Sequence, residues 1–159
     1  MPHTSTADRH RITLKRCDRD VRTIQATFLV DTAQGAVIDA HYSAKWPNGT
    51  KIGLQVARRN AGDLLSLAAD KGYDDMSFRE KLRTEGVRPL IKHWVFAPYD
   101  HAYNGRTEDE LYNQRSICEA VNSVIKRSYV PAVRARAWYC QCREITLAAV
   151  VYNVGQAVK

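Results

Sequence analysis

Long hydrophobic runs are missing from this sequence. No stretch approaches the roughly 18 consecutive apolar residues that a membrane-spanning helix needs, and the N-terminus lacks the apolar core of a signal peptide. Cysteine is also scarce, and the four residues have neither the spacing nor the histidine partners of a zinc site, so we expect reduced thiols. These absences argue against a membrane partner and against a disulfide-stapled secreted protein, and they predict a cytoplasmic location.

Acidic residues are fewer than basic residues in this sequence. The chain of 159 residues carries 17 Asp and Glu against 24 Lys and Arg, which gives a formal net charge of +7 and a pI near 9.4. Excess positive charge favours an anionic partner, most commonly nucleic acid, and so predicts association with the nucleoid. Residues 1–22 are basic and lack sustained periodicity, so we expect a poorly structured arm there. Residues 23–159 show neither a repeat nor a linker, and they predict one globular domain.

Apolar periodicity and turn residues predict alternating strands and helices in this domain. Pro89 places its strand at the edge of a sheet, because proline cannot donate to a strand ladder. The last helix is expected to pack its aliphatic residues, Ile145, Leu147, Val150, Val151 and Val154, into the core. The predicted elements are strands at Thr23–Val30, Ala36–Ser43, Leu64–Ala69 and Val87–Ile91, and helices ending at Arg59 or spanning Asp75–Glu85, Tyr112–Lys126 and Trp138–Val158.

Residues 92–106 contain four aromatic residues and two histidines. We expect a loop that packs its aromatic side chains and exposes His93 and His101, because the spacing of these histidines fits no helical or tight-turn pair of metal ligands.

The predicted helix Tyr112–Lys126 carries four reactive or charged residues on one narrow stripe. At about 100° per residue, Arg115, Glu119 and Lys126 lie roughly 60°, 20° and 40° from Tyr112, all in the same direction. A carboxylate between two cations suits a divalent metal held beside a phosphodiester. Charged residues opposite an apolar face are, however, usually a solvated surface, and the helix alone does not separate these interpretations.

Asp70 directly follows the apolar strand Leu64–Ala69 and precedes a Gly72 turn. Carboxylates at the carboxyl ends of buried strands are where open α/β sheets place ligand-binding and catalytic groups. The alternative interpretation is that Asp70 only caps or shapes the turn.

These residues resemble the DDE transposases of bacterial and archaeal insertion sequences, in the group with a Tyr, Arg, Glu, Lys signature. The gaps of two, three and six residues in that signature match Tyr112, Arg115, Glu119 and Lys126, and ADKGYD at 69–74 is similar to the second acidic motif. The resemblance covers roughly residues 23–159 and implies the C-terminal part of a catalytic domain. The implied fold is α/β and ribonuclease H-like, with a mixed sheet flanked by helices.

The resemblance also implies a chemistry. Asp70 and Glu119 would be catalytic and would hold a pair of Mg²⁺ or Mn²⁺ ions for DNA cleavage and strand transfer. Tyr112, Arg115 and Lys126 would bind DNA. The implied partners are transposon ends and target DNA, together with a second copy of the chain or a full-length transposase.

The first acidic residue of the family lies on the central strand, before the hairpin. Asp8 lies in a polar stretch, and Asp31 and Asp39 come too late in the chain. We therefore expect the central strand and its carboxylate to be missing, which would leave a truncated domain inactive in strand transfer. The alternatives are a non-catalytic DNA-binding regulator derived from a transposase, or another ribonuclease H-like nuclease acting on RNA-containing duplexes.

Overall fold

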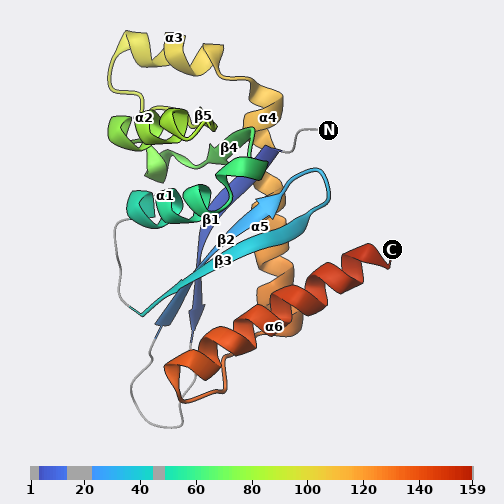
Figure 1. The fold of residues 1–159 in the computed structure, drawn as a ribbon. Coiled ribbons are helices and arrows are strands. Elements are labelled where there is room, and N and C mark those ends of the chain that lie inside the picture. Colours follow the sequence, from blue (N-terminus) through green and yellow to red (C-terminus); the bar gives the residue numbers. More distant parts are fainter. Residues whose placement is uncertain (1–3, 14–22, 45–48, 159) are drawn as a thin grey trace.

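A computed structural model describes residues 4–13, 23–44 and 49–158. Its centre is a five-stranded mixed sheet of order β3-β2-β1-β4-β5 (Figure 1). Strand β1 (Thr4–Thr13) pairs antiparallel with β2 (Thr23–Asp31) and parallel with β4 (Ser66–Ala69). β3 (Ala36–Ser43) pairs antiparallel with β2 at one edge, and β5 (Arg88–Leu90) pairs parallel with β4 at the other.

The expectation that the central strand is missing was wrong. Residues 4–13, which we assigned to the arm, form β1 between β2 and β4; residues 14–22 lie outside the described part of the chain. The sequence of β1 has few apolar residues, so the periodicity of β1 was weak. Backbone hydrogen bonds to strands on both sides define this strand instead, and three threonines favour it.

Helices cover both faces of the sheet. On one face α1 (Gly49–Arg59) and α2 (Met76–Thr84) enclose a core that includes Leu29 and Leu67. On the other, α5 (Arg115–Val124) and α6 (Trp138–Ala157) enclose a core that includes Phe28 and Ile145. Strand β2 is buried on both faces: Ile24, Ala26, Phe28 and Val30 join the core under α5 and α6, and the other face carries Leu29 with the buried polar residues Gln25 and Thr27.

Glycine and aspartate residues shape the turns between these elements. The β2–β3 hairpin turns through Gly35 at φ 62°, a conformation that glycine adopts without steric cost. Asp75 caps α2 by accepting a hydrogen bond from the Phe78 N–H, and Gly86 at φ 78° ends it. Pro89 lies in an edge strand, as predicted.

The segment expected to be a loop contains the helix α3 (Pro98–Arg106). His101 is exposed, as predicted, but the prediction that the aromatic side chains pack was wrong for three of the four, since only Tyr103 is half-buried. Phe96 and Tyr99 are 88% and 75% exposed, and Trp94 is also exposed, whereas His93 is half-buried.

The expected helix Tyr112–Lys126 is divided. Helix α4 (Asp109–Asn113) ends at Gln114, α5 follows, and a π-helical turn, η3 (Ile125–Tyr129), continues it. The Thr32 hydroxyl donates to the side-chain oxygen of Gln114 at 2.8 Å, so the β2–β3 turn holds the junction.

Helix α6 lies along the outer edge of β3 (Figure 1). The Asn153 side chain accepts from the Val37 N–H at 2.9 Å and donates to the Val37 carbonyl at 2.7 Å. The Tyr152 hydroxyl donates to the Gly35 carbonyl, and Tyr42 and Thr146 share a hydroxyl hydrogen bond. Ile145 is buried as expected, but the prediction that the other aliphatic residues of this helix are buried was wrong, because Leu147, Val150, Val151 and Val154 are exposed.

Candidate active site

Asp70 lies at the carboxyl end of the fully buried strand β4. Its side chain is exposed, and Oδ1 accepts a hydrogen bond of 2.9 Å from the Gly72 N–H, which caps the 3₁₀ turn η2 (Lys71–Tyr73). The two interpretations of Asp70 are therefore compatible, since a turn-capping carboxylate also lies at the strand end. In the described part of the chain, no hydrogen bond to Oδ2 is found.

The backbone of Asp8 lies beside that of Asp70. In the parallel register of β1 and β4, Ala7 pairs with Ala69, so Asp8 and Asp70 each follow the last pair by one residue. Asp8 is therefore in the central strand, not in an unstructured arm.

Glu119 lies on α5, which packs against β1 and β2. Its side chain is 53% exposed and pairs with Arg115, one turn earlier, with 2.5 Å between Arg115 Nη1 and Glu119 Oε1. The Arg115 guanidinium also lies 5.4 Å from the centre of the Tyr112 ring, and Lys92 Nζ lies 4.8 Å from the same ring. Tyr112 is buried, so its position is set by two cations and the core.

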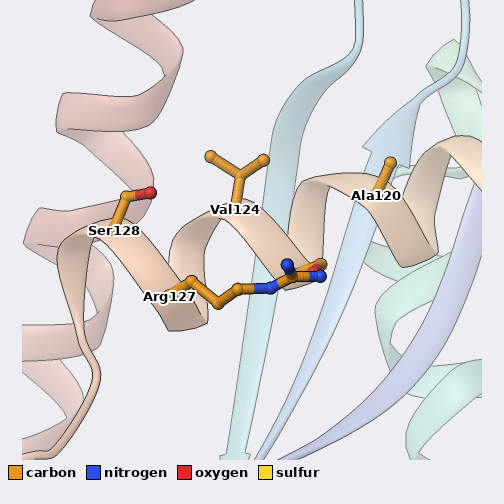
Figure 2. A pocket seen from close by; sticks show the side chains of 5 residues that line it. Ala120, Val124, Arg127 and Ser128 are labelled. Carbon is orange, nitrogen blue, oxygen red and sulfur yellow. The ribbon is translucent and has the colours of Figure 1, made fainter.

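Lys126 lies in the π-helical turn, is exposed, and has no salt bridge to a described residue. The neighbouring Arg127 donates from Nη2 to Ser123 Oγ at 2.5 Å. Arg127 and Ser123 line an open depression of about 350 Å³ on α5 and the π-helical turn, together with Ala120, Val124 and Ser128 (Figure 2). The sequence analysis did not select Arg127, although its spacing of four from Ser123 and eight from Glu119 places all three on one side of the helix.

The structure brings Tyr112, Arg115 and Glu119 into contact. It records no contact between Glu119 and Asp70, and the described residues contain no group of three His, Cys, Asp or Glu side chains that could hold a metal. The candidate site therefore consists of two carboxylates on two elements that both contact β1, namely the end of β4 and helix α5, and one of these carboxylates is paired with an arginine.

Residues 2–154 match the family model described as "Transposase DDE domain". The chain belongs to the DDE transposase family. A search of curated protein sequences found no match.

Solved structures of this class share the fold. The chain is similar to the catalytic core domain of BIV integrase, with a TM-score of 0.59 and 12% identity over 94% of this chain and 82% of that one. The TM-score to the piggyBac transposase in a synaptic complex is 0.64, with 9% identity over 98% of this chain. For a chain of the simian T-cell lymphotropic virus intasome it is 0.54, with 14% identity over 91% of this chain. The chain spans about half of the latter two, 48% in each case. These likenesses confirm a ribonuclease H-like fold.

A buried polar network in this transposase domain was missed by the sequence analysis. The Arg79 side chain is 1% exposed, although arginine usually lies on the solvated face of a helix, and it pairs with Asp74 through Nη1 and Oδ1 at 2.5 Å. Asp74 also accepts hydrogen bonds from His93 Nδ1 and the Trp94 N–H, each at 2.8 Å. Trp94 in turn donates through Nε1 to the Lys71 carbonyl. The network therefore links the turn after Asp70 to the segment that follows β5.

Burial of Asp74 opposes its ionisation. The hydrogen bonds from Arg79 and Trp94, with the positive charges of Arg79 and His93, outweigh that effect and lower the pKa of this carboxyl.

Replacement of Gly72 by Ala should disturb the Asp70 carboxylate. A Cβ at position 72 would lie 2.9 Å from Asp70 Oδ1, so the carboxylate must rotate and lose its hydrogen bond. Under the function proposed below, in which Asp70 would hold a metal, DNA cleavage should fall about 10- to 100-fold, because the orientation of a ligating carboxylate sets metal affinity. Gly62→Ala is the control, since no atom of the described residues lies within 4 Å of a Cβ at that position. Equal activity of the two variants would contradict the prediction.

Proposed function

We propose that this chain is the part of a transposase that cleaves and joins DNA strands in a metal-dependent reaction. One observation carries the proposal: Asp70 ends the strand beside the central strand, and Glu119 lies on the helix packed against it, in a chain whose sequence matches the transposase family. Ligands and catalytic groups of α/β sheets gather at such strand ends.

The donor set suits a hard divalent cation. Carboxylate oxygens are the ligands that Mg²⁺ and Mn²⁺ prefer, and both side chains are exposed. We propose that Asp70 and Glu119 hold the metal, and Asp8, whose backbone lies beside Asp70, is the residue to test as a third carboxylate. When bound, a pair of such ions activates the attacking water or 3′-hydroxyl and stabilises the leaving oxygen.

The cations of the signature would bind DNA phosphates. Arg115 lies 2.5 Å from Glu119, and its guanidinium can bind a phosphate through two parallel hydrogen bonds. Lys126 and Arg127 extend the positive charge along the same helix. Tyr112 would hold Arg115 in position, since the guanidinium lies over the face of the buried tyrosine ring. The piggyBac transposase of similar fold was determined with hairpin DNA.

Cleavage of the DNA ends of its own element tests the proposal. The purified chain is incubated with a labelled duplex carrying such an end, in Mg²⁺, in Mn²⁺ and in EDTA. We expect a nick at the element boundary with either metal and none in EDTA. An RNA-containing duplex serves as the second substrate, and faster cleavage of that duplex would indicate a different ribonuclease H-like nuclease.

A non-catalytic DNA-binding regulator is the second candidate. It is favoured by the Arg115–Glu119 ion pair, which occupies a carboxylate that a metal would need, and by the net charge of +7. Such a chain would bind DNA ends, associate with a full-length transposase and leave DNA intact. Salt-dependent binding to duplex DNA without cleavage in either metal would establish this function and would agree with the expected inactivity.

Replacing Lys126 with Ala should weaken binding to every DNA sequence by about the same factor. Each phosphate neutralised by a lysine adds about 1 to the slope of log affinity against log salt, so the variant should lower that slope by about 1. Fluorescence anisotropy over a potassium chloride series measures the slope. Lys51→Ala is the control, because Lys51 is exposed on α1, on the opposite face of the sheet. Equal slopes for the two variants would exclude Lys126 from the DNA-binding surface.

A further inference from the structure

Trp94 is hydrogen-bonded to the turn that follows Asp70, although its side chain is 53% exposed. The indole Nε1 donates to the Lys71 carbonyl at 3.0 Å, and the backbone N–H donates to Asp74 Oδ2 at 2.8 Å. Lys71 Nζ also lies 5.7 Å from the centre of the indole ring, within the range of a cation–π contact. Lys71 begins the turn η2 and Asp74 directly follows it, so this one tryptophan holds both ends of the turn.

The turn η2 has little support from its own backbone. It is a single 3₁₀ turn, closed by backbone hydrogen bonds of 3.1 and 3.0 Å, and the hydrogen bonds of 3₁₀ turns have poorer geometry than those of α-helices. Its last residue, Tyr73, is buried, but Gly72 is exposed. The exposed part of the turn therefore depends on contacts from other segments, and Trp94 supplies such a contact at Lys71.

One peptide group connects Trp94 to the Asp70 carboxylate. The peptide between Lys71 and Gly72 contains the carbonyl that accepts from Trp94 Nε1, and it also contains the N–H that donates to Asp70 Oδ1 at 2.9 Å. A peptide group is planar, and in its trans form the C=O and the N–H point in opposite directions. A donor that fixes the direction of the carbonyl therefore also fixes the direction of the N–H that holds Asp70.

Trp94 is itself held in place by the helix α3. The Asn104 side chain accepts from the His93 N–H at 2.7 Å and donates to the His93 carbonyl at 3.1 Å. The His93 ring lies 4.0 Å from the ring of Tyr103, centre to centre. The backbone that leads into Trp94 is therefore fixed by contacts outside the turn, and the indole reaches Lys71 from a fixed position.

We propose that Trp94 is a positioning residue for Asp70. Through the Lys71–Gly72 peptide it directs an N–H at Oδ1 of Asp70, which leaves Oδ2 for a metal. The role toward a metal rests on the proposed function, whereas the chain of hydrogen bonds from Trp94 to Asp70 does not. Loss of a group that orients a metal ligand typically lowers metal affinity about 10- to 100-fold, and we expect a loss of this size when the indole N–H is removed.

Hydrogen exchange of the metal-free full chain, followed by NMR, tests the connection between Trp94 and Asp70. Trp94→Phe removes the indole N–H, and it keeps an aromatic ring and the backbone N–H. We expect the Gly72 amide to exchange at least about 10 times faster in this variant than in the unaltered chain. Trp138→Phe is the matched control, since Trp138 is a 43% exposed tryptophan at the start of α6, and it should leave the Gly72 rate unchanged. An unchanged Gly72 rate in Trp94→Phe overturns the proposal.

Binding of Mn²⁺, measured by electron paramagnetic resonance, tests the effect on the metal. The Kd for Mn²⁺ should be about 10- to 100-fold higher in Trp94→Phe than in the unaltered chain or in Trp138→Phe. The urea midpoint and the Kd for DNA in EDTA should stay close to those of the unaltered chain, which separates positioning from a general loss of stability. An unchanged Kd for Mn²⁺ in Trp94→Phe overturns the positioning role and leaves the proposed function standing. An unaltered chain that binds no Mn²⁺ contradicts the proposed function, and the exchange rate of Gly72 then decides whether Trp94 positions Asp70.

A second variant covers the case in which Trp94→Phe disturbs the fold. Benzothienylalanine at position 94 keeps the shape of the indole ring and has a sulfur atom in place of the N–H. Circular dichroism confirms that this variant is folded. It should show the faster Gly72 exchange and the weaker Mn²⁺ binding expected of Trp94→Phe. If both quantities match those of the unaltered chain, the indole N–H does not position Asp70 and the proposal is wrong.

Discussion

Glu119→Gln is expected to abolish metal-dependent DNA cleavage by this chain, with a loss of at least about 10³-fold, or about 4 kcal/mol of transition-state stabilisation. The amide has the shape of the carboxylate but lacks the negative charge that would hold the metal. The substitution also removes the ion pair with Arg115, whose two side chains are 35% and 53% exposed, so the free energy of unfolding should change by less than about 1 kcal/mol. The measurement is the single-turnover rate of end cleavage in Mg²⁺.

Glu110→Gln is the matched control for this variant. Glu110 is exposed on the neighbouring helix α4. The Glu110→Gln variant should cleave DNA at the normal rate. Both variants should bind DNA, because neither substitution removes a cation. Full cleavage by Glu119→Gln would exclude Glu119 from the reaction. Asp70→Asn and Asp8→Asn extend the series: an inactive Asp8→Asn would identify the third carboxylate, and a fully active one would place that ligand elsewhere.

Asp74→Ala should have the largest effect on stability, a loss of about 3–5 kcal/mol in the free energy of unfolding. The Arg79 guanidinium would stay buried without its counter-ion, and the Arg79 Nε already has no hydrogen-bond partner among the described residues. His93 and the Trp94 N–H would lose their acceptor as well. Urea denaturation measures the loss as a shift in the midpoint.

Asp75→Ala is the control for Asp74→Ala. It removes only the N-cap of α2 and should cost about 1 kcal/mol. The double variant Asp74→Ala, Arg79→Met should regain part of the loss, since both charges are then gone. An Asp74→Ala variant as stable as Asp75→Ala would contradict a structural role for this ion pair.

Acid should reduce the difference in the free energy of unfolding between the Asp74→Ala variant and the unaltered chain. The pKa of Asp74 is lowered in the fold, so the carboxylate stabilises the folded chain above its ordinary pKa of 3.8 and loses that effect as the pH falls through the folded pKa. The two denaturation midpoints should therefore converge below pH 3.8 and stay apart at neutral pH.

The sequence predicted those parts of the fold whose residues act locally. The β2–β3 hairpin, the end of β4 at Asp70, the edge position of Pro89 and the stop of α2 at Gly86 each depend on side chains within a few residues. Strand β1 was missed because its position depends on hydrogen bonds to β2 and β4, which are distant in sequence. The polar side chains of β1 give no information about which strands its backbone groups bind.

The sequence indicated which residues to consider for the candidate site, but not how these residues are arranged. The signature spacing led to Arg115 and Glu119, and these two residues do form a pair. The break at Gln114 could not be foreseen, because a hydroxyl from the β2–β3 turn holds that junction. The burial of Arg79 could not be foreseen for the same reason, since its partners are Asp74 and Ile91, which both lie outside the helix.

The Asn153 amide that binds both backbone groups of Val37 also determines how the sheet can meet other chains. β3 is one edge of the described sheet, and an edge strand with free backbone groups is a template for strand addition. At Val37 the amide takes the place of the next strand. The opposite edge, β5, is three residues long and contains Pro89. The Asn153 amide therefore blocks strand addition at Val37, and the short β5 offers few backbone groups to a further strand.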